Sequence, residues 1–129
     1  MTTRLTTQST TPKHVLVVED DFDIRDLLVL ILNNHGYHAA GVSNGQEALA
    51  HLKQTQVIDL ILLDLIMPIM DAWEFRARQQ RHPQFNAIPV VLLSATDEVG
   101  EHVTPLQAAG YLRKPIDFGA LLETVGRYC

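Results

Sequence analysis

The sequence has few of the features that mark secreted, membrane or nucleic-acid-binding proteins. Its one cysteine, Cys129, is the last of 129 residues, so no internal disulfide can form and a reducing compartment is expected. No apolar run approaches the roughly eighteen residues that span a bilayer, and the N-terminus has no apolar stretch of the signal-peptide type. Basic residues number 10 against 15 acidic ones, and the formal charge of −5 argues against a nonspecific nucleic-acid surface. These deficits favour a cytoplasmic protein that binds neither membrane nor nucleic acid directly.

Metal-ligand spacings and internal boundaries are missing as well. The histidines show neither the HxxxH nor the HxH spacing of a zinc site, so we expect them on the surface or in loops. No repeat or linker divides the chain, and 47% hydrophobic with 19% charged residues is the balance of one globular domain. The sequence therefore predicts a flexible N-terminal tail over residues 1–12 and one domain over residues 13–129. The histidines are His14, His35, His38, His51, His82 and His102.

The chain does contain a regular alternation of apolar runs of strand length with helical patterns. The third and fourth runs, LILL and VVLL, are apolar throughout, which is typical of strands covered by helices on both faces. Apolar residues recur at helical spacing between and after the runs. Five such βα units predict an α/β fold with a doubly wound parallel sheet. The predicted strands are residues 14–18, 38–42, 60–63, 90–93 and 111–113, and the predicted helices include 71–80 and 116–128.

Polar residues follow these strands at their carboxyl ends, where open α/β sheets bind their ligands. They are Glu19, Asp20 and Asp21 after the first strand, Asp64 after the third, Ser94 after the fourth and Lys114 after the fifth. Crowded carboxylates repel unless a cation neutralises them, and Mg²⁺ prefers such oxygen ligands. Asp21 is expected to cap the first helix, and capping or solvation explains Glu19 and Asp20, taken alone, as well as metal binding does. Asp64 ends a buried strand and has no capping role to explain it.

Four segments, HVLVVEDD, LILLDLIMPIMDAWEF, IPVVLLSA and GYLRKP, together resemble the receiver domain of bacterial response regulators, from about Lys13 to the C-terminus. The resemblance implies a flavodoxin-like fold with strand order 2-1-3-4-5. It also implies a role in a two-component phosphorelay. The domain would accept a phosphoryl group from a sensor histidine kinase or phosphotransfer protein and then change its protein–protein contacts with a downstream target. Such a domain is a signalling switch rather than an enzyme, and a single-domain regulator is the simpler expectation for this chain.

The resemblance also assigns roles to the polar residues at the strand ends. Asp64 matches the phosphoacceptor. Glu19 and Asp20 match the acidic pair that binds Mg²⁺ together with Asp64, Asp20 directly and Glu19 through water. The backbone carbonyl of Ile66 would be a further metal ligand.

Three more positions match residues that respond to the phosphoryl group. Ser94 matches the hydroxyl that bonds a phosphoryl oxygen, and Lys114 matches the lysine that pairs with the phosphoryl charge, followed by a cis bond to Pro115. Tyr111 matches the aromatic switch that turns inward on activation. The assignment is physically coherent because phosphoryl transfer needs positioning and neutralisation of oxygen charge rather than covalent help. Movement of Ser94 toward the phosphoryl group would open space for Tyr111, which makes a bistable element.

The chain departs from the usual pattern of that family at several places. Ala72 stands where the family commonly has glycine, so the loop there is expected to be reshaped or the position already helical. The segment from Ser94 to Lys114 is short and contains Pro105, so the fourth helix is expected to be short, frayed or displaced. Ile66 and Thr96 occupy positions that border the route of the hydrolytic water in the family. Branched, apolar Ile66 is expected to obstruct that route and prolong the phosphorylated state.

Other functions stay open at this point. A Mg²⁺-dependent phosphatase or phosphotransferase with an aspartyl-phosphate intermediate would carry an acid two residues after the nucleophile, where this chain has Ile66, which cannot donate a proton. A flavodoxin-like cofactor site would need a Ser/Thr/Gly-rich loop after the first strand, where this chain has three acids. A degenerate receiver that is never phosphorylated and serves only as a docking surface is a further alternative.

Overall fold

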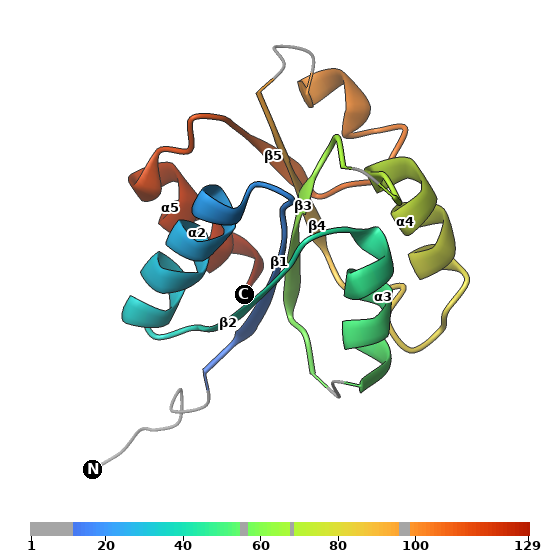
Figure 1. Cartoon of the computed structure of the whole chain (residues 1–129), viewed down its shortest axis with the longest axis horizontal. Helices are drawn as coiled ribbons and strands as arrows, with labels where there is room; N and C mark the ends of the chain where they lie inside the picture. The colour runs from blue at the N-terminus through green and yellow to red at the C-terminus, as the bar shows by residue number, and fades with distance from the viewer. Residues whose placement is uncertain (1–11, 55–56, 68, 96–98) are drawn as a thin grey trace.

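The computed structural model describes residues 12–54, 57–67, 69–95 and 99–129. The predicted tail, residues 1–12, lies outside the described residues except for Pro12. Five parallel strands form one sheet in the order β2-β1-β3-β4-β5, which confirms the predicted fold class and strand order (Figure 1). The strands are β1 (His14–Val18), β2 (His38–Val42), β3 (Leu60–Asp64), β4 (Val90–Ser94) and β5 (Gly110–Arg113).

Helices cover both faces of the sheet, as the apolar β3 and β4 require. In Figure 1, α2 and α5 lie on one face and α3 and α4 on the other. Side chains alternate along a strand, so Val15 and Val17 pack among the first pair of helices while Leu16 and Val18 pack with the second. The helices are α2 (Phe22–Asn34), α3 (Gly45–Gln54), α4 (Ala72–Gln80) and α5 (Phe118–Tyr128), and η2 (Val99–His102) is a short 3₁₀ helix. None of the helices in the described residues is long and apolar enough to cross a bilayer.

Aspartates set where three of the helices begin. The carboxylates of Asp21, Asp71 and Asp117 each accept a hydrogen bond from the backbone N–H three residues on, at 3.0, 3.0 and 2.8 Å. This confirms the predicted capping role of Asp21 and satisfies N–H groups that have no partner within the helix. The predicted starts at residues 71 and 116 were wrong by one and two residues, because Asp71 and Asp117 are the extended caps that precede α4 and α5. Ala72 is the first residue of α4, so the expectation that this position is already helical is confirmed.

The connection between β4 and β5 contains only η2 and turns within its described residues. This confirms the expectation that the helix between the fourth and fifth strands is short. Its carboxyl end is held by Arg76 of α4, which is 6% exposed. Arg76 donates from Nε to the Leu106 carbonyl at 2.8 Å and from Nη2 to the Gln107 carbonyl at 2.9 Å. Leu106 in turn donates its N–H to the His102 carbonyl at 3.0 Å. One buried side chain therefore fixes the segment that replaces a full helix.

Candidate functional site at the carboxyl edge of the sheet

The predicted polar residues come together because neighbouring parallel strands end at the same edge. Backbone hydrogen bonds extend the sheet past the strands: Glu19 N–H donates to the Val42 carbonyl at 3.0 Å, and Lys114 N–H donates to the Ser94 carbonyl at 2.9 Å. Asp64 is the last residue of β3, and Ser94 is the last residue of β4. The bond between Lys114 and Pro115 is cis, as the resemblance implied.

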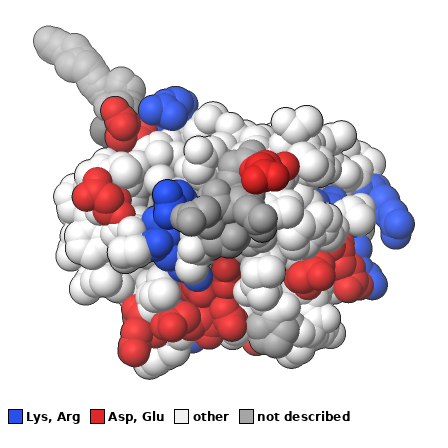
Figure 2. Space-filling view, turned by 90° about the horizontal axis from the view of Figure 1, so that it is seen from above, with Lys and Arg blue, Asp and Glu red and all other residues white. Residues whose placement is uncertain are grey.

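Three carboxylates form the centre of the site. Oxygens of Glu19, Asp20 and Asp64 lie within 4.8 Å of one another. Glu19 and Asp64 are buried, and Asp20 is exposed. Figure 2, which views the molecule from above, shows acidic side chains gathered in one area of this face with basic side chains at its border. Such a cluster can hold a hard divalent cation, because oxygen ligands at this spacing suit it and its charge offsets their repulsion.

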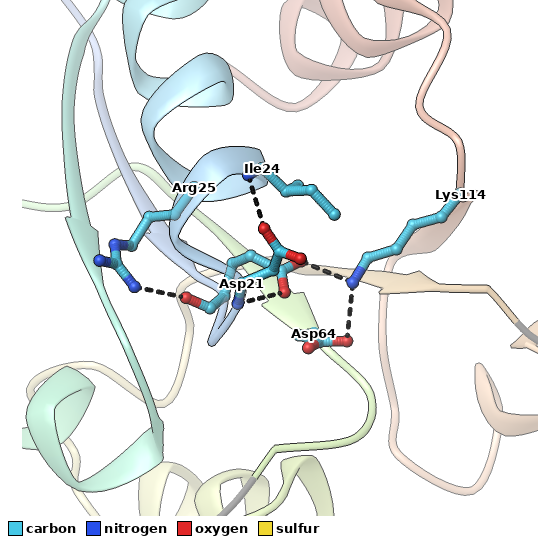
Figure 3. A network of polar contacts seen from close by, with 6 residues as sticks. Asp21, Ile24, Arg25, Asp64 and Lys114 are labelled. Atoms are coloured by element: carbon cyan, nitrogen blue, oxygen red, sulfur yellow. Dashed lines mark hydrogen bonds and ion pairs between the residues drawn. The ribbon is translucent and has the colours of Figure 1, made fainter.

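The Lys114 ammonium lies between two of these carboxylates. Its Nζ is 2.7 Å from Glu19 Oε1 and 3.4 Å from Asp64 Oδ1. In Figure 3 the side chains of Lys114 and Asp64 point toward one another from opposite sides of the site. Burial alone would lower the pKa of Lys114, but its interactions with Glu19 and Asp64 outweigh burial and raise that pKa. The lysine is therefore a fixed positive charge beside Asp64.

Glu19 is anchored at both its backbone and its carboxylate. Arg25 of α2 donates to the Glu19 carbonyl at 3.0 Å, and the Asp21 N–H donates to Glu19 Oε2 at 3.1 Å (Figure 3). The other oxygen, Oε1, is buried and accepts no hydrogen bond of regular geometry, although it is ion-paired with Lys114. A buried carboxylate oxygen with capacity left is a fit for a cation or for a water bound to one.

The protonation of Asp64 reflects how crowded the site is. Burial is the largest cause, and the neighbouring Asp20 and Glu19 add to it, so that the pKa of Asp64 is raised to about 8 in spite of Lys114. For Asp20, burial works in the same direction, but hydrogen bonding with Asp64 and Glu19 outweighs it and lowers the pKa. Burial and neighbouring acids therefore disfavour the ionised form of Asp64, and a cation bound among these carboxylates would favour it.

A cleft of about 470 Å³ opens above these carboxylates. Ser94, which is buried, and Ile66, which is 68% exposed, both line it. Several lining residues were not predicted as part of the site. Among them are Trp73 of α4 and His102 of η2, whose rings meet edge to face with centroids 5.1 Å apart. A tryptophan in the first turn of a helix and a histidine without metal-site spacing gave no chemical signal in the sequence. Their approach depends on how the β4–β5 connection folds.

One predicted position lies apart from the cleft, and another lies outside the described residues. Tyr111 is on β5, 48% exposed, and is not among the described residues that line the cleft. It pairs in register with Leu92 of β4, two residues before Ser94. Thr96 lies outside the described residues, so only Ile66 of the two positions predicted to border the water route has a described place.

Comparisons with known proteins agree with this architecture. The family model of the response regulator receiver domain matches residues 15–126. The transcriptional regulatory protein PcoR of Escherichia coli is 34% identical over 117 residues, which are 88% of this chain and 50% of PcoR. The chemotaxis response regulator CheY4 of Vibrio cholerae has a TM-score of 0.84 at 30% identity, over 92% of this chain and 100% of that one. The cyanobacterial phytochrome response regulator RcpA has a TM-score of 0.74 at 31% identity, over 89% of each chain.

The open parallel sheet with a carboxylate cleft at its carboxyl edge defines an α/β domain of the doubly wound class, whose ligands bind at the strand ends. The chain belongs to the response regulator receiver domain family of two-component signalling. It spans about half or less of the length of the curated transcriptional regulators it matches.

Proposed function

We propose that this receiver domain accepts a phosphoryl group on Asp64 in a Mg²⁺-dependent reaction and then switches its contacts with a downstream protein. The donor would be the phosphohistidine of a sensor histidine kinase or of a phosphotransfer protein, acting in the cytoplasm. The observation that carries the proposal is the setting of Asp64: a buried carboxylate at the end of β3, 3.4 Å from the Lys114 ammonium and open to a cleft.

The carboxylates fit a magnesium ion. Glu19, Asp20 and Asp64 would hold it with the backbone carbonyl of Ile66, Asp20 directly and Glu19 through water. The buried Glu19 Oε1 that lacks a regular hydrogen bond and the raised pKa of Asp64 both indicate a site built for a cation. When bound, Mg²⁺ supplies positive charge that ionises Asp64 and neutralises phosphoryl oxygens.

The chain's own residues would then orient and stabilise the transfer. An ionised Asp64 oxygen attacks phosphorus, a P–O bond forms, and the P–N bond to the donor imidazole breaks with its electron pair leaving on nitrogen. Lys114 would pair with one equatorial oxygen, and the distance of 3.4 Å from its Nζ to Asp64 Oδ1 supports this role. The Ser94 hydroxyl, at the end of the adjacent strand β4, would donate to another.

The response would spread from Ser94 to β5. Drawing the Ser94 side chain toward the phosphoryl group vacates space beside β5, and Tyr111, which is 48% exposed, would turn into it. A local charge event thereby biases a packing element with two arrangements. RcpA, one of the similar proteins, is known as a phosphorylated structure, which supports the same chemistry here.

The test is phosphorylation by a small phosphodonor such as acetyl phosphate, followed by intact mass. The parent should gain one phosphoryl group with Mg²⁺ and none after chelation, and Asp64→Asn should gain none. Asp71→Asn is the matched control: it makes the same chemical change on an exposed aspartate, and asparagine keeps the helix cap. Absence of labelling in the parent would refute the proposal and favour a receiver used only for docking.

A further inference from the structure

Three histidines lie near one another at the opposite edge of the sheet, where the strands begin. His14 begins β1 and His38 begins β2, and the two are direct partners in the parallel register. Their rings meet edge to face, with centroids 5.0 Å apart and planes at 86°. His51 of α3 lines the same pocket of about 330 Å³. The spacing of the histidines in the sequence argues against a zinc site, but strand register brings together residues that are far apart along the chain.

The three rings share one layer of the molecule. His14 alternates with Leu16 and Val18 along β1, and His38 alternates with Ala40 along β2, so both rings lie on the face of the sheet that α3 covers. Leu16 and Ala40 pack in the same cluster as the buried residues of α3, and His51 stands near the end of that helix. The position of His51 is therefore fixed relative to the strands by the packing of the core.

The surroundings suit a cation. No lysine or arginine is among the described residues that line the pocket. Asp59 precedes β3, and its Oδ2 accepts a hydrogen bond from the backbone N–H of His14 at 2.8 Å, which holds the start of β1 in place. His38 is exposed and His14 and His51 are half-buried, so none of the three side chains is enclosed by the core.

We propose that His14, His38 and His51 form a binding site for a divalent transition metal that prefers imidazole ligands, such as Zn²⁺, Ni²⁺ or Cu²⁺. Neutral imidazole is the common ligand for these metals, whereas Mg²⁺ prefers the carboxylates at the other edge. Among the described residues only the carboxylates of Glu19, Asp20 and Asp64 bring three ligand atoms within 4.8 Å of one another, so the three imidazoles would rotate to direct one nitrogen each to a shared point. The bound ion would tie the edge strand β2 to β1 and to α3.

Zinc titration by calorimetry on the untagged full chain tests the site. Excess Mg²⁺ is present throughout to occupy the carboxylate cluster, so that zinc binding there does not contribute to the measured heat. The parent should bind one equivalent of Zn²⁺, and His14→Asn, His38→Asn and His51→Asn should each weaken binding about tenfold or more. His35→Asn is the control, because His35 is an exposed histidine at the end of α2 and asparagine suits a helix end. It should bind like the parent.

A spectroscopic readout separates a lost ligand from a damaged fold. In the parent, imidazole proton resonances of His14, His38 and His51 should shift together on addition of Zn²⁺, while those of His35 and His82 stay in place. Asp20→Asn should leave the zinc affinity unchanged. The proposal is overturned if the parent binds no zinc, if any of the three variants binds as the parent does, or if Asp20→Asn abolishes the binding.

Discussion

The two walls of the cleft at the carboxyl edge of the sheet are built in different ways. One wall, the acidic wall, consists of Glu19, Asp20, Asp64 and Lys114, and the strands of a buried sheet place these residues directly. The other, the second wall, contains Trp73 and His102. It is held by the contact between their rings and by the hydrogen bonds of one buried arginine, Arg76. The residues of the proposed phosphoryl transfer therefore lie on the ends of buried strands. The opposite wall can rearrange at the cost of a few side-chain interactions, which suits a surface that reports a signal.

Removing Arg76 should have the largest effect. Arg76→Met leaves the Leu106 and Gln107 carbonyls and the Gln79 side chain without their donor, and we expect the free energy of unfolding to fall by about 3 kcal/mol. Urea denaturation measures it. Trp73 is the chain's one tryptophan, so its emission should also shift to the red as the wall loosens.

Arg78 provides the matched control on the same helix. It is exposed and forms a surface ion pair with Glu74 at 2.8 Å, so Arg78→Met should cost about 0.5 kcal/mol or less. Equal losses for the two arginine variants would contradict the view that the second wall depends on one buried side chain.

The acidic wall should be destabilising in the absence of a cation. An unfolded aspartate has a pKa of about 3.9, and burial with neighbouring acids raises that of Asp64 to about 8 in the folded protein. The folded state therefore keeps a proton that the unfolded state releases, and the Asp64 contribution to stability falls as the pH rises from about 4 to 8. Asp64→Asn removes this loss. In the presence of a chelator we expect Asp64→Asn to be about 1–2 kcal/mol more stable than the parent at pH 8, and the difference to shrink at pH 5.

Magnesium sharpens the same measurement. Mg²⁺ that binds only the folded parent should stabilise it in proportion to the logarithm of its concentration, with little effect on Asp64→Asn. Asp71→Asn, which carries the same change away from the cleft, should behave as the parent does. A stability difference between parent and Asp64→Asn that does not change with pH would show that the pKa of Asp64 is not raised in the folded protein.

Ile66 should have the smallest effect on stability and a selective effect on the lifetime of the phosphorylated state. Its side chain is 68% exposed at the cleft, and Ile66→Asn keeps the backbone carbonyl that would bind the metal. We expect the aspartyl phosphate to decay several-fold faster in this variant, because a polar side chain admits the attacking water that isoleucine obstructs. Loss of label with time after removal of the donor measures this decay.

Ile69→Asn is the control for that experiment. Ile69 is 74% exposed in the same loop, is not among the described residues lining the cleft, and has φ of 71°, a conformation that asparagine tolerates well. Its phosphoryl lifetime should match the parent's. An unchanged lifetime in Ile66→Asn would remove Ile66 from the hydrolytic route.

The strands and the acidic wall were predictable from the sequence because both follow from short-range patterns. The apolar runs marked all five strands to within one residue at either end. Since parallel strands end at one edge, the residues after them, Glu19, Asp20, Asp64 and Lys114, had to meet. The starts of α4 and α5 were predicted too early because aspartate serves equally well as a cap and as a residue of the first turn.

The second wall and the histidine pocket were not predictable, and for a shared reason. The contact of Trp73 with His102 depends on how the β4–β5 connection packs on α4. Arg76 holds that connection by hydrogen bonds to backbone carbonyls, and every residue has a carbonyl, so the sequence does not reveal these partners. The pairing of His14 with His38 depends on strand register. Both contacts join residues that are far apart in the sequence and follow no periodic pattern, so only the folded structure reveals them.

The most direct test of the central claim locates the phosphoryl group. Borohydride reduces an acyl phosphate and converts the aspartate that carries it into homoserine, which peptide mass analysis assigns to one position. After treatment with acetyl phosphate and Mg²⁺, the account predicts homoserine at position 64, and none there when Mg²⁺ is chelated. Homoserine at Asp20 or Asp59 with Asp64 unchanged, or no reduced residue at all, would contradict it.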